Sequence, residues 1–225
     1  MSNQQLTPRE TAAGSGIGRA SGFELARPGQ PGAANVEAAL ARNRAFAAAG
    51  GHHGAVVFPN LRLFVITCLD PRVDPAHFLD LGLSDAMVIR NVGGRVTPEV
   101  LNDVAFIGQL AETALPDGPL FEVAVIHHTQ CGTGALADDT FRRRYAQRIG
   151  AEESILIEHA VLDPVATATR DVERLRSAPA ISPRVTVSGH VYDVVTGLVQ
   201  TVIPACSSAA RTVEQPQIAH GDETS

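Results

Sequence analysis

The sequence predicts an α/β fold in which a mostly parallel central sheet is flanked by helices, and three observations support this prediction. Short apolar runs alternate with helical segments through the middle of the chain, a pattern typical of parallel strands joined by helices. The chain has 225 residues, enough for one domain with a substantial core. Hydrophobic residues make up 44% of it, which indicates a globular protein. We expect an N-terminal arm and helix before the sheet and closing edge strands after it.

The two ends of the chain differ in composition from its middle. Residues 1–34 are rich in Gly, Ala, Pro and polar residues and show no sustained period, so we expect a mobile arm. A helix is predicted over residues 36–49, because Asn35 can cap its start and Gly50 and Gly51 can end it. The single domain is expected to span residues 35–205, followed by a flexible tail over residues 206–225.

Three strands are expected at residues 61–67, 86–90 and 121–127, because each is a short and mostly apolar run. A short helix is predicted between the first two, at residues 75–81. A longer helix begins after Thr97, a capping residue that is followed by Pro98 at the first helical position. Apolar residues recur along this helix at spacings of 3 and 4. They are Val100, Val104, Ile107, Ala111 and Ala114.

The remaining elements are predicted in the same way. Helices are expected at residues 133–148 and, capped by Asp163 and Pro164, up to about residue 177. Two closing strands at residues 185–187 and 198–202 are joined by a turn-rich link at residues 192–197. This last pair can be parallel or can form a hairpin at the edge of the sheet.

Charge and composition exclude several kinds of partner. The net charge of -6 argues against nucleic acid, because phosphate binding needs a basic face. The only basic run, residues 142–144, is expected on a solvated helix face. No stretch approaches the ~18 apolar residues of a membrane span, and no signal peptide is visible, so we expect a cytoplasmic protein without a membrane partner. Its three cysteines should then be reduced.

The most informative segment is Cys68-Leu69-Asp70-Pro71-Arg72, which follows the first predicted strand directly. If strand geometry persists through it, Cys68, Asp70 and Arg72 share one face. A soft ligand, a hard ligand and a cation in one place suggest a metal site. The segment that runs from His128 to Cys131 is the candidate for completing this site.

Topology can bring these two segments together. In open α/β sheets, ligands bind outside the carboxyl ends of the strands, where Cys68 lies and just beyond which His128 and Cys131 follow. Two thiolates and an imidazole favour zinc over magnesium or calcium. Three protein ligands leave a fourth position open, which is typical of a catalytic zinc site. Spacing alone allows either His127 or His128 as the ligand.

The pattern Cys-x-Asp-x-Arg followed by His-x-x-Cys resembles the β-class carbonic anhydrases. The resemblance spans residues 57–202, and residues 88–94, 128–132 and 187–197 are also similar to stretches of that family. Gly93 and Gly94 belong to the first of these stretches, where they either form a tight turn with positive φ or allow close approach of the backbone. The chain departs from the family in two respects: His127 stands where a Gly is frequent, and Trp is absent.

The resemblance implies roles for particular residues. Cys68, His128 and Cys131 become the ligands of one Zn²⁺ per subunit, and Asp70 and Arg72 become a catalytic dyad. In the active form, Arg72 would hold Asp70 away from the metal, whereas in a resting form Asp70 would fill the fourth position. The resemblance also implies a small-molecule substrate and a homodimer or higher homo-oligomer.

The expected function is the zinc-dependent reversible hydration of CO2 to bicarbonate and a proton. The alternative is hydrolysis of carbonyl sulfide or carbon disulfide on the same site, because these linear molecules differ little in shape from CO2. A non-catalytic zinc protein is disfavoured, since a structural site needs neither Asp70 nor Arg72. A reactive Cys68–Cys131 dithiol is weaker still, because neither lies in Cys-x-x-Cys. His127 is expected either to relay protons or to lie in the core or at an interface, and Cys206 to be a bystander.

Overall fold

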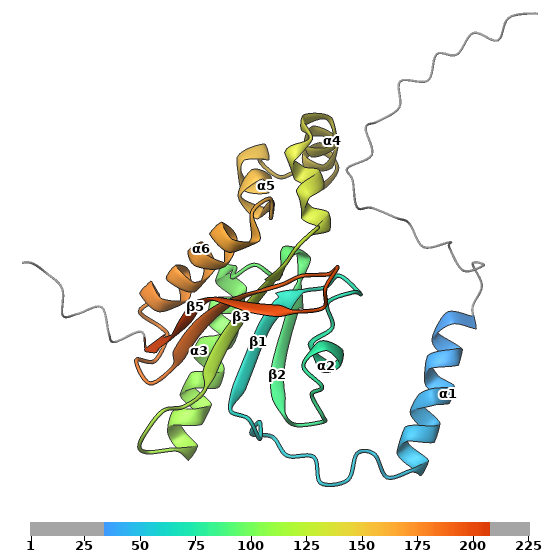
Figure 1. Cartoon of the computed structure of the whole chain (residues 1–225), viewed down its shortest axis with the longest axis vertical. Helices are drawn as coiled ribbons and strands as arrows, with labels where there is room; N and C mark the ends of the chain where they lie inside the picture. The colour runs from blue at the N-terminus through green and yellow to red at the C-terminus, as the bar shows by residue number, and fades with distance from the viewer. Residues whose placement is uncertain (1–33, 208–225) are drawn as a thin grey trace, which may run out of the picture. The chain divides into compact units, whose positions relative to one another are not determined.

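The computed structural model describes residues 34–207 (Figure 1). Nearly all of the expected arm and tail therefore lies outside the described residues. The first helix, α1 (Ala34–Ala48), begins before Asn35, the residue expected to cap it. The last strand, β5 (Val199–Ser207), runs two residues beyond the expected end of the domain. Within residues 34–207, no helix combines the length and the hydropathy that a membrane span requires.

A five-stranded sheet lies at the centre of the fold, with the strand order β2-β1-β3-β4-β5. The first four strands pair in parallel, and β5 pairs antiparallel with β4. The predicted α/β class with a mostly parallel sheet is therefore confirmed, and the closing pair is a hairpin at one edge (Figure 1). The parallel strands are β1 (Leu63–Cys68), β2 (Ala86–Asn91), β3 (Glu122–His128) and β4 (Thr186–Tyr192).

The strands form because their sequences can be buried on both sides. In β1, every residue from Phe64 to Cys68 is buried, as expected of a central strand in a parallel sheet. One face of the sheet packs against α3 (Pro98–Ala114) and α6 (Pro164–Ser177). The other carries a smaller cluster with Phe78 at the end of the short helix α2 (Pro75–Phe78). The main core thus lies on the face that α3 and α6 cover.

The single helix predicted at residues 133–148 is wrong, because the chain breaks it in two. A short 3-10 helix, η2 (Gly132–Ala137), is followed by α4 (Asp139–Ile149). The Asp138 carboxylate accepts a hydrogen bond from the Phe141 amide at 2.7 Å and so begins a new helix there. A further helix, α5 (Glu153–His159), was not predicted, since its seven residues are too few to show a clear period.

The expectation that residues 142–144 form a solvated basic face is wrong for Arg142. Its side chain is 11% exposed and donates hydrogen bonds to Glu153 at 3.2 Å and to the Leu136 carbonyl at 3.0 Å. A guanidinium has five donors in a fixed fork, so it can join three segments of chain at once. Arg142 therefore holds α4 against the helices on either side of it in the sequence.

Candidate metal centre

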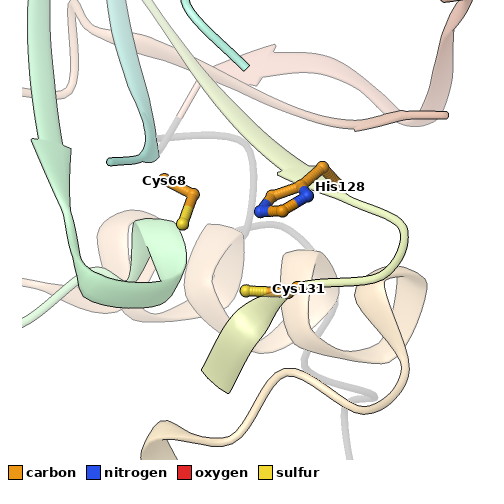
Figure 2. Close-up of side chains that lie close together, drawn as sticks. All are labelled: Cys68, His128 and Cys131. Atoms are coloured by element: carbon orange, nitrogen blue, oxygen red, sulfur yellow. The ribbon is translucent and has the colours of Figure 1, made fainter. Parts of the chain in front are cut away.

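Three potential metal ligands meet where two neighbouring strands end. Cys68 is the last residue of β1 and His128 the last of β3, and these strands are hydrogen-bonded neighbours. Cys131 follows in a turn where Gln130 has a positive φ of 55°. Each residue offers one donor atom, and these atoms all lie within 4.8 Å of one another (Figure 2). The carboxyl ends of β1 and β3 thus bring together the three side chains that the sequence predicted to form one metal site.

A local hydrogen bond orients the His128 ring toward the two sulfur atoms. Its Nδ1 lies 2.9 Å from the Thr129 carbonyl oxygen, which only accepts, so Nδ1 carries the proton and donates it. Nε2 therefore keeps a free lone pair. Among the described residues, this buried nitrogen has no hydrogen-bond partner. Buried polar atoms are normally satisfied, and a bound metal would satisfy this one.

A hydrogen bond between the two thiols shifts their pKa values in opposite directions. A hydrogen bond to Cys131, together with burial, raises the pKa of Cys68 to about 12. The same hydrogen bond, helped by the Thr133 hydroxyl, lowers the pKa of Cys131 to about 6. The Thr133 oxygen lies 3.1 Å from the Cys131 sulfur. One thiolate is thus already favoured, and a cation would favour the second, because metal ligation ionises thiols.

The geometry of the Asp70–Arg72 segment differs from the sequence expectation. Strand geometry ends at Cys68, and Pro71 and Arg72 lie in a turn, so the shared strand face was wrong. The turn instead folds Arg72 back onto Asp70. Its Nε lies 3.0 Å from Oδ1 and its Nη2 lies 2.7 Å from Oδ2. Both carboxylate oxygens are therefore held by one guanidinium, a geometry that favours a firm pair.

Arg72 also determines the charge and position of Asp70. Its hydrogen bonds hold the pKa of the Asp70 carboxyl below the usual range, so the carboxylate is ionised at neutral pH. Arg72 Nη2 further donates to the Gln130 carbonyl at 3.0 Å, in the turn between His128 and Cys131. The dyad is thus tied directly to the ligand loop.

Arg90 supports the same segment, and the sequence reasoning did not identify it. Its guanidinium donates to the Cys68 carbonyl at 3.1 Å, to the Asp70 carbonyl at 2.8 Å and to the Asp74 carboxylate at 2.9 Å. These bonds fix the backbone at Cys68 and Asp70 and connect the motif to the Asp74 side chain. The available signal was an arginine in an otherwise apolar strand.

Gly93 and Gly94 form a tight turn with positive φ and also allow close approach of the backbone, the two roles considered for this pair. The two glycines have φ values of 81° and 65°, which side chains rarely adopt. A Cβ on Gly94 would also lie 2.7 Å from the Cys68 amide nitrogen. Positive φ and close approach of the backbone therefore coincide here, directly behind a candidate metal ligand.

His127 lies apart from the three donor atoms. It is fully buried, and its Nε2 lies 3.1 Å from the Asp171 carboxylate. Adjacent residues of a strand point to opposite faces, so only His128 turns toward the cysteines. The core position, one of the two roles expected for His127, fits this burial, whereas a proton relay to solvent does not.

The donor set as a whole fits zinc. Two cysteine sulfurs and one imidazole nitrogen are the soft and borderline ligands that zinc prefers, and the unsatisfied Nε2 of His128 leaves its lone pair free for a metal. Asp70 is not among the clustered donors within the described residues and is paired with Arg72 instead. Val73 and Val161 pack against the two cysteines and line the site with apolar surface.

Comparisons with known proteins agree with this geometry. A family model described as "Carbonic anhydrase" matches residues 63–201. "Beta-carbonic anhydrase 1" of Mycobacterium tuberculosis is 29% identical over 146 residues, which cover 65% of this chain and 85% of that protein. "Carbon disulfide hydrolase" of an Acidianus strain is 28% identical over 160 residues, covering 61% and 75%. The crystal structure of a carbonic anhydrase from Streptococcus mutans matches with a TM-score of 0.61 and 28% identity, covering 74% of this chain and 96% of that one.

Proposed function

This chain belongs to the carbonic anhydrase family, in its β class, and from that premise we propose that it hydrates CO2 reversibly to bicarbonate and a proton with one zinc ion per subunit. The observation that carries the proposal is the Asp70–Arg72 pair beside the buried donor set of Cys68, His128 and Cys131. A zinc site that served structure alone would normally have four protein donors and would need no such pair.

Each residue has a distinct task in this proposal. Cys68, His128 and Cys131 hold the zinc and leave one position open. When bound, the zinc supplies a nucleophile by lowering the pKa of water to about 7. Asp70 accepts a hydrogen bond from the reacting water and orients it toward CO2. Arg72 keeps both oxygens of Asp70 occupied, so the carboxylate does not take the open position itself.

The direct test measures metal content and CO2 hydration on the same purified preparation. We expect close to one zinc per chain, hydration that a chelator abolishes, and recovery on adding zinc. The variant Cys131→Ser should lose both the metal and the activity, because a serine hydroxyl is a poor zinc ligand. Cys206→Ser is the matched control, since Cys206 lies on β5 and is no part of the donor cluster. A chain without zinc, or with hydration that survives its removal, would refute the proposal.

Hydrolysis of carbon disulfide or carbonyl sulfide is the second candidate. The carbon disulfide hydrolase of Acidianus supports this candidate. It is 28% identical to this chain, and the carbonic anhydrase of M. tuberculosis is 29% identical. The substrates are linear and similar in size, so a few pocket contacts decide between them. Measuring all three substrates on one zinc-loaded preparation separates the candidates. Carbon disulfide or carbonyl sulfide turnover with negligible CO2 hydration would favour the second.

We also propose that the chain forms a homo-oligomer in the cytoplasm. Helix α1 exposes large apolar side chains, with Val36 at 64%, Leu40 at 46% and Phe46 at 44%. A second copy would bury such residues. A reducing compartment would keep the two ligand thiols available for metal. Light scattering of the purified chain should give at least twice the monomer mass, whereas a monomer at micromolar concentration would contradict the assembly.

A further inference from the structure

We propose that Asp171 is a positioning residue for the metal centre, because this one buried carboxylate connects the segments that carry all three donor side chains. The inference rests on the proposed zinc site. Asp171 lies on α6, outside both sequence motifs, and is fully buried. A buried carboxylate must be paired to be tolerated, and its partners here lead toward the metal ligands.

Asp171 has two charged or polar partners. Arg95 donates to it from Nε at 2.8 Å and from Nη2 at 3.1 Å, and His127 lies 3.1 Å from it through Nε2. Burial raises the pKa of Asp171, yet the hydrogen bonds from His127 and Arg95 outweigh it and hold the pKa below the usual range. The carboxylate is therefore ionised and accepts from both partners.

The first connection leads to Cys68. Arg95 directly follows the Gly93–Gly94 turn, and its backbone amide donates to the Asn91 side chain at 2.8 Å. The Asn91 amide group returns a hydrogen bond to the Arg95 carbonyl at 2.8 Å, which closes the turn. Gly94 lies in close contact with the backbone of Cys68. Anchoring Arg95 on Asp171 therefore holds this turn against the first ligand.

The second connection leads to His128. His127 precedes it in β3, and the two side chains point to opposite faces of the sheet. Asp171 fixes the His127 ring from the α6 side of the strand. The end of β3 is thus held from behind at the residue next to the ligand.

The third connection leads to Cys131. Arg95 Nη1 also donates to the Glu158 carbonyl near the end of α5. Shortly after it, the Val161 amide donates to the Thr133 hydroxyl at 3.2 Å. That hydroxyl lies 3.1 Å from the Cys131 sulfur. The same guanidinium that binds Asp171 therefore also restrains the segment that supports the third ligand.

The test is the zinc affinity of Asp171→Asn, measured by competition with a chromophoric chelator. The amide keeps the shape of the side chain but turns a donor toward Arg95, so the connections loosen. We expect zinc to bind about tenfold more weakly, the lower end of the effect of residues that support metal ligands. The absorption spectrum of the cobalt-substituted protein should change as well, because it reports the coordination geometry.

Arg176→Met is the matched control. Arg176 lies on the same helix and donates to the carbonyls of Val187 at 2.6 Å and Pro204 at 2.9 Å, both distant in sequence from the metal ligands. Its loss should lower the thermal midpoint and leave zinc affinity and the cobalt spectrum unchanged. If Arg176→Met weakened zinc binding as much as Asp171→Asn, a general loss of stability would explain both, and the inference would fail.

A second variant decides the matter if Asp171→Asn does not fold. Arg95→Lys keeps a cation opposite Asp171 but loses the fork that reaches Glu158 as well. It too should weaken zinc binding about tenfold by the same reasoning. If the folded variant bound zinc as tightly as the wild type, the inference about Asp171 would be overturned and the proposed function would stand. A wild-type chain that binds no zinc would overturn the proposed function, and the inference with it.

Discussion

Arg72 occupies both oxygens of Asp70 and also reaches the Gln130 carbonyl, so one side chain determines where the carboxylate of the dyad points. The residue types of the motif predicted a metal site with a paired acid and base. The turn that forms the pair was not predicted, because the sequence pattern did not show that the strand ends at Cys68 and that Pro71 and Arg72 lie in a turn.

Arg72→Lys should lower CO2 hydration by about tenfold or more, while zinc content stays unchanged. Lysine has a point charge and lacks the planar fork, so it cannot hold both carboxylate oxygens and the Gln130 carbonyl together. The rate of CO2 hydration per bound zinc is the measurement. Arg143→Lys is the control, since Arg143 is exposed and its nitrogen lies 3.9 Å from Asp139. Equal rates for Arg72→Lys and wild type would show that the fork is dispensable.

The pH dependence of stability follows from the lowered pKa of Asp70. A carboxyl whose folded pKa lies below its unfolded value stabilises the fold above the unfolded value, about 4, and loses this contribution as pH falls through the folded value. The difference in unfolding free energy between metal-free wild type and Asp70→Asn should shrink as pH falls below about 4. Urea denaturation between about pH 5 and pH 3 measures it. A difference that stayed constant across this range would contradict the lowered pKa of Asp70.

At the scale of helices and strands, periodic and apolar segments were predictable and their interruptions were not. The strands β1, β2 and β3 and the helix α3 follow from apolar runs and from a Thr-Pro start. The break at Asp138 and the short helix α5 depend on contacts made after folding, such as those of Arg142 with Glu153 and with the Leu136 carbonyl. Such contacts leave little trace in a local sequence pattern.

Gly94→Ala tests the close contact between the η1 turn, Val92–Gly94, and β1. Alanine would adopt a strained positive φ and its Cβ would collide with the Cys68 backbone, so stability should fall by more than the ~1–3 kcal/mol of backbone strain alone, and zinc affinity should fall too. Gly118→Ala is the matched control, since it has a φ of 77° with nothing within 4 Å of a Cβ. Urea denaturation and zinc competition compare the two. Equal losses of stability and zinc affinity in the two variants would show that the close contact of Gly94 with Cys68 has no effect of its own.

At the scale of the whole molecule, the site depends on residues far apart in the sequence. The strand-end rule predicted that Cys68 would meet His128 and Cys131, since it needs only the order of parallel strands. The strand-end rule could not predict the contact between Arg95 and Asp171, which lie 76 residues apart. One signal was available: Asp171 stands among Ala168, Val172 and Leu175 on the buried side of α6, where a charge requires a partner.

Zinc removal should destabilise the entire domain, because the three proposed ligands come from two strands and the turn after the second. A ligand that binds only the folded state stabilises it by about 2.7 kcal/mol at a free concentration 100 times Kd. The thermal midpoint should therefore fall on chelation and return on adding zinc. An unchanged midpoint would mean that the donor set does not hold the metal in the folded chain.

The most direct test of the central claim compares Asp70→Asn with wild type in zinc content and CO2 hydration. Asp138→Asn serves as the control, because it makes the same chemical change at the cap of α4, where an amide still caps. We predict full zinc content in all three proteins and a loss of hydration of about 100-fold or more in Asp70→Asn alone, because the reacting water loses the carboxylate that orients it. Full hydration by Asp70→Asn with zinc bound would contradict the role of the dyad in catalysis.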